Sequence, residues 1–394
     1  MGNTSICLIA HNACGAMRGG VTGHIGGAEQ QTALMARWLA ARGHRVSLLT
    51  WDEGLPTDTI IDGVSMLGVC RADAGVPGLR FIYPRGIGLF AAMKKANADV
   101  YYHNSAEAVT GLAAAWCRRQ GRQFIYSVAS DVACERDLPT LRGIRDRALY
   151  RYGVRNANKV IVQTNRQATL LKESFGVEAT PLPMPCRFTP VIGSAAARPF
   201  GPPRVAWVGR IDRMKRMEWV LDIAERMPEI IFDLVGADAH ISSLADYAEQ
   251  LRVRAESIPN VKWHGALPHE QVRDIYRKAL CLCCTSSYEG FPNTFLESWS
   301  QARPIVSSFD PDGLIQKHEM GSFTRNVAEF VEAIRELSIS SESWHRQSLN
   351  SLDYYSRNHN QELAMPRFEK VILETIRKAE GVPMLGTSDL QVPL

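Results

Sequence analysis

Short apolar runs alternate with longer amphipathic segments along most of the chain. The runs at 5–10 (SICLIA) and 45–50 (RVSLLT) are too short for globular helices and predict strands. Between them, a glycine-rich stretch over 11–30 leads into a segment through Ala41 whose apolar positions recur at helical spacing. Strand, glycine-rich turn, helix and strand form one βαβ unit, which predicts a parallel sheet with a ligand at its carboxyl edge.

The alternation is interrupted once and then restarts. Residues 191–203 (VIGSAAARPFGPP), rich in Pro, Ala and Gly, are the predicted linker between domains over 1–190 and 204–360. A final helix is predicted over 361–380, and the tail at 381–394 has no pattern and is predicted to be disordered. Further predicted strands lie at 99–102, 123–128, 159–164, 204–208, 230–235 and 261–263, and further helices at 107–119, up to 175, 218–227, 241–256, 328–337 and 341–355.

Length and composition narrow the class of protein. At 394 residues the chain exceeds one ordinary core, so two α/β domains are expected. No apolar run is long enough to span a membrane and no signal-peptide pattern is present, which predicts a cytoplasmic protein. The formal charge of +4 is mild and no nucleic-acid motif occurs, so no nucleic-acid partner is expected. We interpret the nine cysteines as buried thiols in a reducing compartment, with a zinc site as the alternative.

The stretch from Cys281 to Ser300 (CLCCTSSYEGFPNTFLESWS) concentrates the candidate chemistry. Its pattern predicts a buried strand over 280–284, a polar loop over 285–291 and then a helix. The helix is expected to start near Asn293, which is a good N-cap residue because its side chain can accept a hydrogen bond from an amide one turn later. The free amides at such a start can also hold an anion such as phosphate.

Two carboxylates bracket this corner, Glu289 in the loop and Glu297 in the helix. A pair of carboxylates is suited to vicinal hydroxyls through charge-assisted hydrogen bonds. A corner that accepts both a phosphate and a polyol fits a nucleotide sugar. The Glu-x7-Glu spacing alone is common by chance, and the alternative is a helix-capping Glu297 with a solvated Glu289.

A second pair of candidate residues follows the predicted strand at 204–208. Arg210 and Lys215 of the segment GRIDRMK lie where both side chains can reach one diphosphate, Arg as a planar fork and Lys as a mobile point charge. Gly27, at the start of an earlier predicted helix, allows the backbone to approach a diphosphate closely. Taken alone, a pair of cations of this kind more often lies on a solvated surface, and the glycine also fits an ordinary flexible turn.

Taken together, these motifs resemble those of retaining glycosyltransferases of the family-4 type. The resemblance covers most of the chain, because EGFPNTFLE (289–297), G-R-x4-K (209–215), the Gly26-Gly27 loop, NANKVIVQT (156–164) and ARPIVSS (302–308) occur in the family's order. The family implies the GT-B architecture, in which two Rossmann-like doubly wound domains face each other across a cleft. It also implies that the final helix crosses back to the N-terminal domain.

The resemblance assigns roles to individual residues. Arg210 and Lys215 would neutralise the phosphates of the leaving nucleotide, and Glu289 would hold hydroxyls of the transferred sugar. The other implied donor contacts are Glu297 with the ribose hydroxyls, the backbone of Gly27, Asn293 and Thr294 with phosphate or sugar, and the 265–267 backbone, including Leu267, with the base.

The reaction implied by the family moves a sugar, with retention of configuration, from a nucleotide-diphosphate sugar to a hydroxyl acceptor. The acceptor is expected to be a carbohydrate or a lipid-linked molecule, in cell-surface or exopolysaccharide synthesis. Two cations and helix amides already stabilise the leaving diphosphate, so no metal cofactor is expected. The departing phosphate oxygen is expected to help deprotonate the acceptor.

One departure from the family pattern concerns the acceptor side. Many relatives carry a histidine after the strand that matches 123–128, but this chain has Ser-Val-Ala-Ser-Asp at 127–131. Ser130, Asp131 and His103, which follows the preceding strand, are the residues expected to replace it.

Other interpretations stay open at this point. Asp310-Pro311-Asp312 is a D-x-D that can chelate a divalent ion, although its Pro and the next Gly are typical of a turn. A sugar-nucleotide epimerase of the same architecture and a non-catalytic sugar-nucleotide-binding protein are the alternative functions. The basic stretch 142–159 fits either a solvated helix face or contact with an anionic acceptor or membrane surface.

Overall fold

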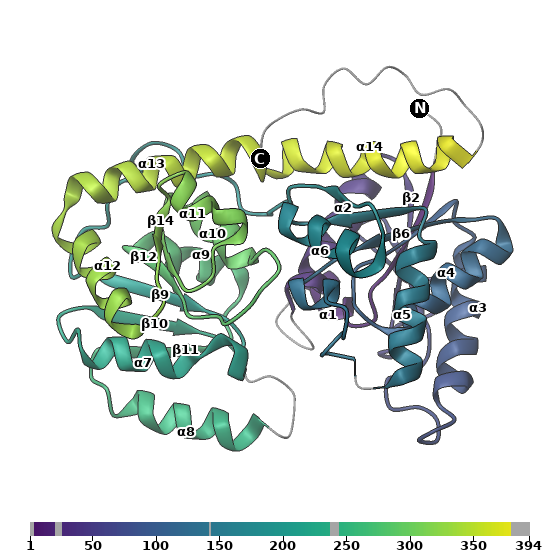
Figure 1. Cartoon of the computed structure of the whole chain (residues 1–394), viewed down its shortest axis with the longest axis horizontal. Helices are drawn as coiled ribbons and strands as arrows, with labels where there is room; N and C mark the ends of the chain where they lie inside the picture. The colour runs from purple at the N-terminus through teal and green to yellow at the C-terminus, as the bar shows by residue number, and fades with distance from the viewer. Residues whose placement is uncertain (1–3, 20–25, 142, 237–243, 380–394) are drawn as a thin grey trace. The chain divides into compact units, whose positions relative to one another are not determined.

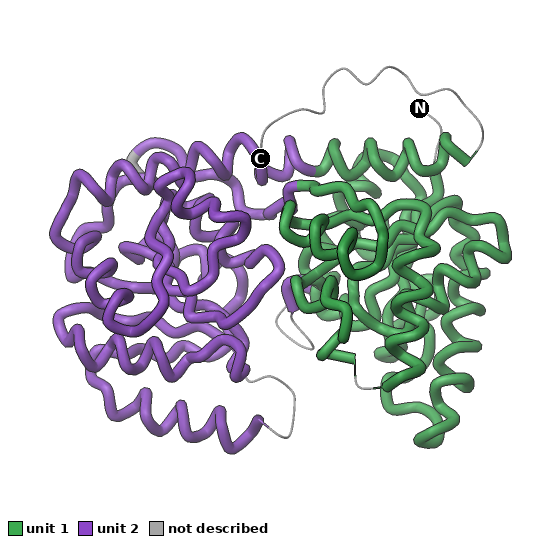
Figure 2. Tube along the Cα trace, in the orientation of Figure 1, with its two compact units in different colours: residues 1–18, 28–182, 365–394 green, residues 19–27, 183–364 purple. Residues whose placement is uncertain are grey.

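The computed structural model describes residues 4–19, 26–141, 143–236 and 244–379 (Figure 1). The predicted tail at 381–394 lies outside the described residues. Contacts divide the chain into two compact units, one of residues 1–18, 28–182 and 365–394 and one of residues 19–27 and 183–364 (Figure 2). The division after residue 182 compares with a boundary expected at 190, and the predicted linker groups with the second unit.

Among the described residues, the first unit contains a sheet with the strand order β3-β4-β2-β1-β5-β6-β7-β8. All neighbouring pairs are parallel except β3 with β4. Chain order reverses between β1 and β5, which makes their carboxyl ends the topological switch point where α/β sheets bind ligands. The strands are β1 (Ser5–Ile9), β2 (Arg45–Thr50), β3 (Ile60–Ile61), β4 (Val64–Gly68), β5 (Val100–His103), β6 (Gln123–Ser127), β7 (Lys159–Val162) and β8 (Thr180–Pro181).

Helices connect these strands and cover the sheet (Figure 1). They are α1 (Cys14–Met17), α2 (Gly27–Ala41), a π-helical segment (Phe81–Gly86), α3 (Ile87–Ala96), α4 (Ala108–Gln120), a 3-10 turn (Asp131–Cys134), α5 (Ile144–Asn156) and α6 (Asn165–Phe175). From residue 365 onward, α14 (Gln361–Ala379) also groups with this unit, where Glu369 pairs with His44 at 2.8 Å.

Two glycines allow α4 and α5 to pack closely. A Cβ atom added at Gly111 would lie 2.2 Å from the Leu149 carbonyl oxygen, and one added at Gly153 would lie 2.5 Å from the Thr110 carbonyl. Real Cβ atoms do not approach backbone so closely, so each position excludes a side chain. The two helices therefore meet backbone to backbone.

The second unit contains a parallel sheet in the order β11-β10-β9-β12-β13-β14 within the described part of the chain. Numbered within the unit, this order is 3-2-1-4-5-6, that of dinucleotide-binding domains, with its switch point between β9 and β12. The strands are β9 (Arg204–Val208), β10 (Ile231–Val235), β11 (Val261–Gly265), β12 (Cys281–Cys284), β13 (Ile305–Ser307) and β14 (Gly321–Phe323).

The helices of this unit follow its strands in alternation. They are α7 (Met217–Glu225), α8 (Ala245–Glu256), α9 (His269–Lys278), α10 (Asn293–Ser300), α11 (Leu314–Lys317), α12 (Val327–Ile339) and α13 (Ser341–Asn358), with 3-10 turns at Gly193–Ala196, Arg213–Lys215 and Pro311–Gly313. All nine cysteines are free, and every one except Cys70 is buried. No described helix has the length and apolarity needed to cross a bilayer.

Candidate functional site

The two motif segments of the second unit emerge from neighbouring strands. Residues 209–216 follow β9 and residues 285–292 follow β12, and the two strands are paired through Ala206 and Leu282. Both segments therefore lie at the carboxyl edge of the sheet, at its switch point. This edge is where ligands bind in open α/β sheets.

The segment after β9 is held in a defined turn. Asp212 caps the short 3-10 helix, its Oδ1 accepting from the Met214 amide at 3.2 Å, while the Lys215 amide donates to the Asp212 carbonyl at 2.9 Å. Asp212, which lies within the G-R-x4-K pattern, thus fixes the backbone that carries Lys215.

Arg216 joins this segment to the ends of β12 and β13. Its guanidinium donates to the Thr285 carbonyl at 2.6 Å, the Ser286 carbonyl at 3.1 Å and the Ser308 hydroxyl at 2.7 Å. The Ser287 amide adds a bond to the Met214 carbonyl at 2.8 Å. Sequence reasoning missed Arg216, and no local pattern marks it, because its partners lie about 70 and 90 residues away.

Lys215 and Glu289 form an ion pair between their two loops. Their side chains are only 19% and 13% exposed, and Lys215 Nζ donates to Glu289 Oε1. Burial alone lowers the pKa of Lys215, but the Glu289 carboxylate more than reverses this, so the pKa of Lys215 lies above its usual value. The exposed Arg210 is close enough to Lys215 to oppose this rise slightly. The interpretation of Glu289 as a solvated residue was wrong.

Helix α10 begins at Asn293, one residue earlier than a cap at Asn293 would place it. Pro292 occupies the N-cap position and makes no side-chain cap bond, so the prediction that Asn293 is the N-cap was wrong. Asn293 Nδ2 instead donates at 3.0 Å to the carbonyl of Gly27, which groups with the same unit. A Cβ atom at Gly27 would lie 2.9 Å from that nitrogen. The amides of Asn293 and Thr294 belong to the first turn of α10.

Glu297 lies inside α10, where it is largely buried and does not cap the helix. The Tyr276 hydroxyl of α9 donates to Glu297 Oε2 at 3.0 Å, and His269 Nδ1 lies 4.0 Å from Oε1. Burial raises the pKa of Glu297 to about 7, although Tyr276 and Arg187 act in the opposite direction. The interpretation of Glu297 as a helix cap was therefore wrong. Leu267, the expected contact of the base, lies in the connection between β11 and α9.

The acceptor-side candidates of the first unit, His103, Ser130 and Asp131, differ in the contacts they make. His103 ends β5 at the switch point, with Nδ1 2.8 Å from the Ile9 carbonyl oxygen, and its buried Nε2 meets no hydrogen-bond partner of standard geometry among the residues that the structure describes. Desolvation lowers the pKa of His103 despite the nearby Glu107 carboxylate. Ser130 precedes the 3-10 turn that begins at Asp131.

Asp131 is bound to helix α6. Its carboxylate accepts from Gln167 Nε2 at 3.0 Å and lies 3.3 Å from Arg166 Nε. These contacts anchor the loop after β6 to the helix after β7.

Sequence reasoning missed two residues near His103. His11 follows β1, stacks on Trp51 at 4.1 Å between ring centroids, and lies 3.9 Å from Glu107 Oε2. Desolvation, the largest single cause, acts to raise the pKa of Glu107, but the hydrogen bond to His11 together with electrostatic interactions with His103, His11 and Arg85 outweighs it, so the pKa is lowered. Both residues come directly after neighbouring strands at the switch point, a signal that could have identified them.

The Asp310 carboxylate of the D-x-D accepts hydrogen bonds from backbone amides. The donors are the amides of Ile315 at 2.8 Å and Gln316 at 3.2 Å, at the start of α11. Within the described ranges, no group of three or more His, Cys, Asp or Glu side chains is arranged to hold a metal ion.

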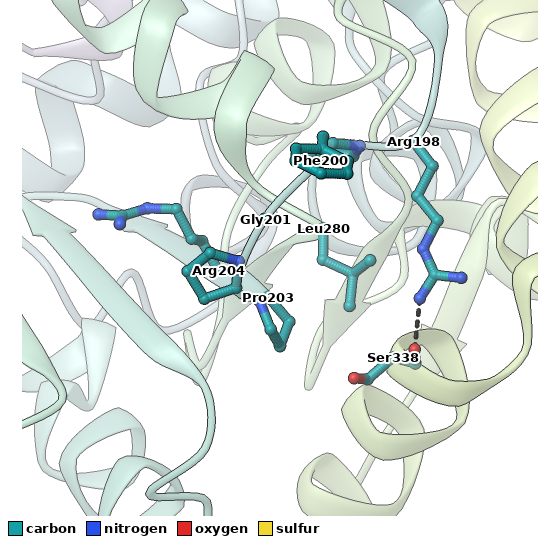
Figure 3. A pocket seen from close by; sticks show the side chains of 9 residues that line it. Arg198, Phe200, Gly201, Pro203, Arg204, Leu280 and Ser338 are labelled. Atoms are coloured by element: carbon teal, nitrogen blue, oxygen red, sulfur yellow. Dashed lines mark hydrogen bonds between the residues drawn. The ribbon is translucent and has the colours of Figure 1, made fainter.

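A cavity of about 310 Å³ lies away from the motif loops (Figure 3). Residues 198–204, Leu280 and Ser338 line it, beside the amino ends of β9 and β12. Arg198 points along one wall and donates to the carbonyls of Leu337 and Ser338. The cavity is therefore at the opposite edge of the sheet from Lys215 and Glu289.

Comparison with known families matches both halves of the chain. Residues 26–185 match the glycosyl transferase 4-like domain, and residues 202–339 match the glycosyl transferases group 1 domain. The chain belongs to the group 1 glycosyl transferases. A comparison with curated protein sequences gives no significant match for this glycosyltransferase.

Solved structures of glycosyltransferases share the fold of this chain over nearly its whole length. Sucrose-phosphate synthase from Thermosynechococcus elongatus has a TM-score of 0.76 at 19% identity, covering 95% of this chain and 100% of that one. Anabaena HepE in complex with UDP and glucose has a TM-score of 0.72 at 14% identity, covering 94% and 99%. The lipopolysaccharide outer core galactosyltransferase WaaB has a TM-score of 0.62 at 16% identity, covering 94% and 99%. The glycosyltransferase has the GT-B fold, with two Rossmann-like α/β domains, as the sequence predicted.

Proposed function

We propose that this glycosyltransferase binds a nucleotide-diphosphate sugar on the loops after β9 and β12 and transfers the sugar with retention of configuration to a hydroxyl acceptor. The Lys215–Glu289 ion pair carries the proposal. It places a cation beside a carboxylate at the switch point, and in the proposed donor a phosphate is bonded directly to a sugar that offers hydroxyls. On donor binding, Lys215 would contact the phosphate and Glu289 would contact the sugar hydroxyls next to it.

The remaining donor contacts are proposed for residues near the same carboxyl edge of the second sheet. Arg210 is exposed beside Lys215, and together they would stabilise the charge that grows on the leaving diphosphate. Amides of Asn293 and Thr294 would add to this at the start of α10, near Gly27. Glu297 would accept from the ribose hydroxyls, and the base would lie along the backbone of 265–267, at Leu267.

Retention is proposed to proceed without a protein nucleophile. The bond between the sugar and the leaving phosphate oxygen breaks while the acceptor oxygen bonds to the same face of the sugar. The departing phosphate oxygen takes the acceptor proton. The protein's contribution is positioning and charge stabilisation, which Arg210 and Lys215 supply.

The reaction is proposed to need no metal ion. Lys215 and Arg210 supply positive charge where the diphosphate would bind, and the Asp310 carboxylate already accepts from the amides of Ile315 and Gln316. Treatment with EDTA should therefore leave transfer intact. Activity lost with EDTA and restored by manganese would contradict this part of the proposal.

The acceptor is proposed to be a carbohydrate or lipid-linked molecule bound by the first unit. His103 is buried at the switch point, and the His11–Glu107 pair lies beside it. Ser130 and Asp131 are further candidates, although Asp131 is already engaged by Gln167 and Arg166. A cytoplasmic role in cell-surface or exopolysaccharide synthesis fits such an acceptor.

Donor screening tests the proposal directly. UDP-sugars come first, because HepE has been solved with UDP-glucose and the pneumococcal O-GlcNAc transferase GtfA with UDP and GlcNAc. A donor that binds only the folded chain will raise its melting temperature, so UDP-, GDP- and ADP-sugars can be ranked by thermal shift. The anomeric configuration of the product, determined by NMR, then tests retention.

Alanine variants of Arg210, Lys215 and Glu289 should each fold and lose transfer activity, by about a hundredfold or more for the cations. Full activity in all three would refute the site. Release of free nucleotide without any acceptor would instead indicate an epimerase, and donor binding without turnover would indicate a binding protein.

A further inference from the structure

The first unit exposes a concentrated group of large apolar side chains. Within the described residues, Val76, Leu79, Ile82, Tyr83 and Ile87 are each between 54% and 68% exposed although they lie within twelve residues of one another. Ile144, at the first position of α5, is 88% exposed. Clustered exposure of this kind marks an interaction site more often than scattered single residues do.

The segment 76–87, which carries five of these exposed side chains, has a hydrogen-bonded backbone. Backbone bonds link the Arg80 amide to the Val76 carbonyl at 2.8 Å and the Ile82 amide to the Leu79 carbonyl at 2.9 Å. Arg85 donates to the Ala72 carbonyl at 2.7 Å, which ties the π-helical segment back to the preceding loop. The apolar side chains are therefore presented by formed structure that leads into α3 (Figure 1).

Cations are interleaved with these apolar positions. Arg145, next to Ile144, stacks on Phe81 with its Cζ 3.7 Å from the ring centroid, so α5 and the 76–87 segment meet there. Arg80 is exposed between Leu79 and Ile82. Residues 71–87 and 143–155 together carry seven arginines against two aspartates, Asp73 and Asp146. The local field is thus positive.

The topology places this surface at the functional edge of the first sheet. The 76–87 segment follows β4, and Ile144 follows β6, so both lie at the carboxyl ends of parallel strands. His103 and the His11–Glu107 pair lie at the same edge. Three other arginines of the basic stretch 142–159 instead donate to backbone carbonyls: Arg147 to Leu141, Arg151 to Arg136 and Arg155 to Phe175.

We propose that Val76, Leu79, Arg80, Ile82, Tyr83, Ile87, Ile144 and Arg145 form a membrane-docking surface for an anionic lipid bilayer. The apolar side chains enter the boundary between headgroups and acyl chains, and the arginines meet anionic headgroups. Charge complementarity selects this occupant, since an uncharged apolar partner would not require the interleaved arginines. The surface brings the acceptor edge of the first unit to the bilayer, where a lipid-linked acceptor is found.

Vesicle flotation of the full chain tests the proposal. The protein should float with vesicles that contain phosphatidylglycerol and bind pure phosphatidylcholine vesicles at least about tenfold more weakly. High salt should release it from the anionic vesicles, because exposed charges are screened. Absence of flotation with either vesicle would overturn the proposal.

Two double variants separate the apolar and the electrostatic contributions. Leu79→Ser/Ile82→Ser should lower the partition coefficient onto anionic vesicles by roughly tenfold or more. The matched control is Ile192→Ser/Phe200→Ser, which removes two highly exposed apolar side chains of the second unit and should leave flotation unchanged.

Arg80→Gln/Arg145→Gln should weaken binding to anionic vesicles by about tenfold. Its control, Lys94→Gln/Arg119→Gln, makes the same charge change in the last turns of α3 and α4, at the other edge of the same sheet. All four variants change exposed side chains, so their melting temperatures should equal that of the parent. Equal flotation of every variant, or a change in oligomeric state without a change in flotation, would overturn the proposal in favour of a protein interface. Transfer to a water-soluble acceptor should persist in all four, so this test is independent of the proposed chemistry.

Discussion

Tyr276 donates its phenolic hydrogen to Glu297 at 3.0 Å, joining the helix before β12 to the helix after it. One hydroxyl does not compensate for the burial of the carboxylate, and the pKa of Glu297 rises to about 7 as a result. The proposed ribose contact is therefore a group that titrates near neutral pH.

Donor affinity should fall as the pH drops below about 7. Ionised Glu297 accepts two hydroxyl hydrogens, whereas the protonated form loses acceptor capacity, so the Kd for a nucleotide sugar should rise by up to about tenfold per pH unit. Isothermal titration calorimetry across this range measures the effect. Glu297→Gln should bind weakly and without the pH dependence, while Glu332→Gln, at an exposed position of α12, should retain the parent profile. A Kd that is constant through pH 7 contradicts the assignment.

Stability should show the complementary dependence on pH. The folded pKa of about 7 exceeds the reference value of 4.5, so the folded state holds a proton that the unfolded state releases between these values. Glu297 therefore lowers the free energy of unfolding as pH rises through this window. Glu297→Gln should be more stable than the parent at pH values above 7, by on the order of 2–3 kcal/mol, and show no gain below 4.5. Urea unfolding at both ends of the window checks this, and an equal gain at both would show a different cause.

Lys215 and Glu289 should be strongly coupled in stability. Replacing either one with alanine leaves the other charge largely buried and unpaired, which costs about 3 kcal/mol. The double variant should lose much less than the sum of the two single losses. The exposed pair Lys95–Asp58, 2.9 Å apart, provides a comparison cycle with a coupling below about 1 kcal/mol. Additive losses at 215 and 289 would show that the pair is not formed in solution.

Arg216→Ala should disrupt the connected loops. Removing the three hydrogen bonds of Arg216 leaves the buried Thr285 carbonyl without this donor, whereas the Ser286 carbonyl still accepts from the Ser308 hydroxyl at 3.0 Å. We therefore expect a loss of about 2 kcal/mol in unfolding free energy and weaker donor binding. Arg213→Ala is the matched control, because Arg213 is exposed in the same segment and only stacks on Tyr247 at 4.7 Å. Chemical unfolding and donor titration measure both variants. Equal effects would mean that the loops do not depend on Arg216.

Gly111→Ala should destabilise the first unit by more than about 3 kcal/mol. The added Cβ would meet the Leu149 carbonyl oxygen at 2.2 Å, and neither helix backbone can move without disturbing its own hydrogen bonds. Gly143→Ala should cost less than about 1 kcal/mol, since the nearest atom that its Cβ would meet is 3.8 Å away and only a helix N-cap is changed. Thermal unfolding compares the two, and similar melting temperatures would contradict close packing of α4 and α5.

Local sequence patterns anticipated most strands and helices because each carried its own apolar signal. The run at 281–284 is a fully buried strand, and the pattern break near 190–203 lies close to the division after residue 182. Short elements were missed where this signal was weak. These include β4 (VSMLG), the π-helical segment with α3, and α9, which buries only Val272 and Tyr276.

The candidate site was recognised from motif spacing, but its internal contacts were not. The motifs placed Lys215 and Glu289 at one sheet edge, whereas their pairing depends on how two loops 74 residues apart fold together. The burial of Glu297 and its bond to Tyr276 likewise depend on the packing of α9 against α10. Asn293 was assigned as a cap from its residue type, although Pro292 takes that position. Tertiary contacts decided each of these outcomes.

The reactivity of the three thiols of β12 can report on the unfolding of the second unit. Cys281, Cys283 and Cys284 are buried in the central region of the second sheet, and desolvation raises the pKa of each thiol. Alkylating reagents attack thiolates, so these sulfurs should react only when the sheet opens. Counting the alkylated sites over time by mass spectrometry would thus give the opening rate of the domain proposed to hold the donor. A bound nucleotide sugar should lower this opening rate.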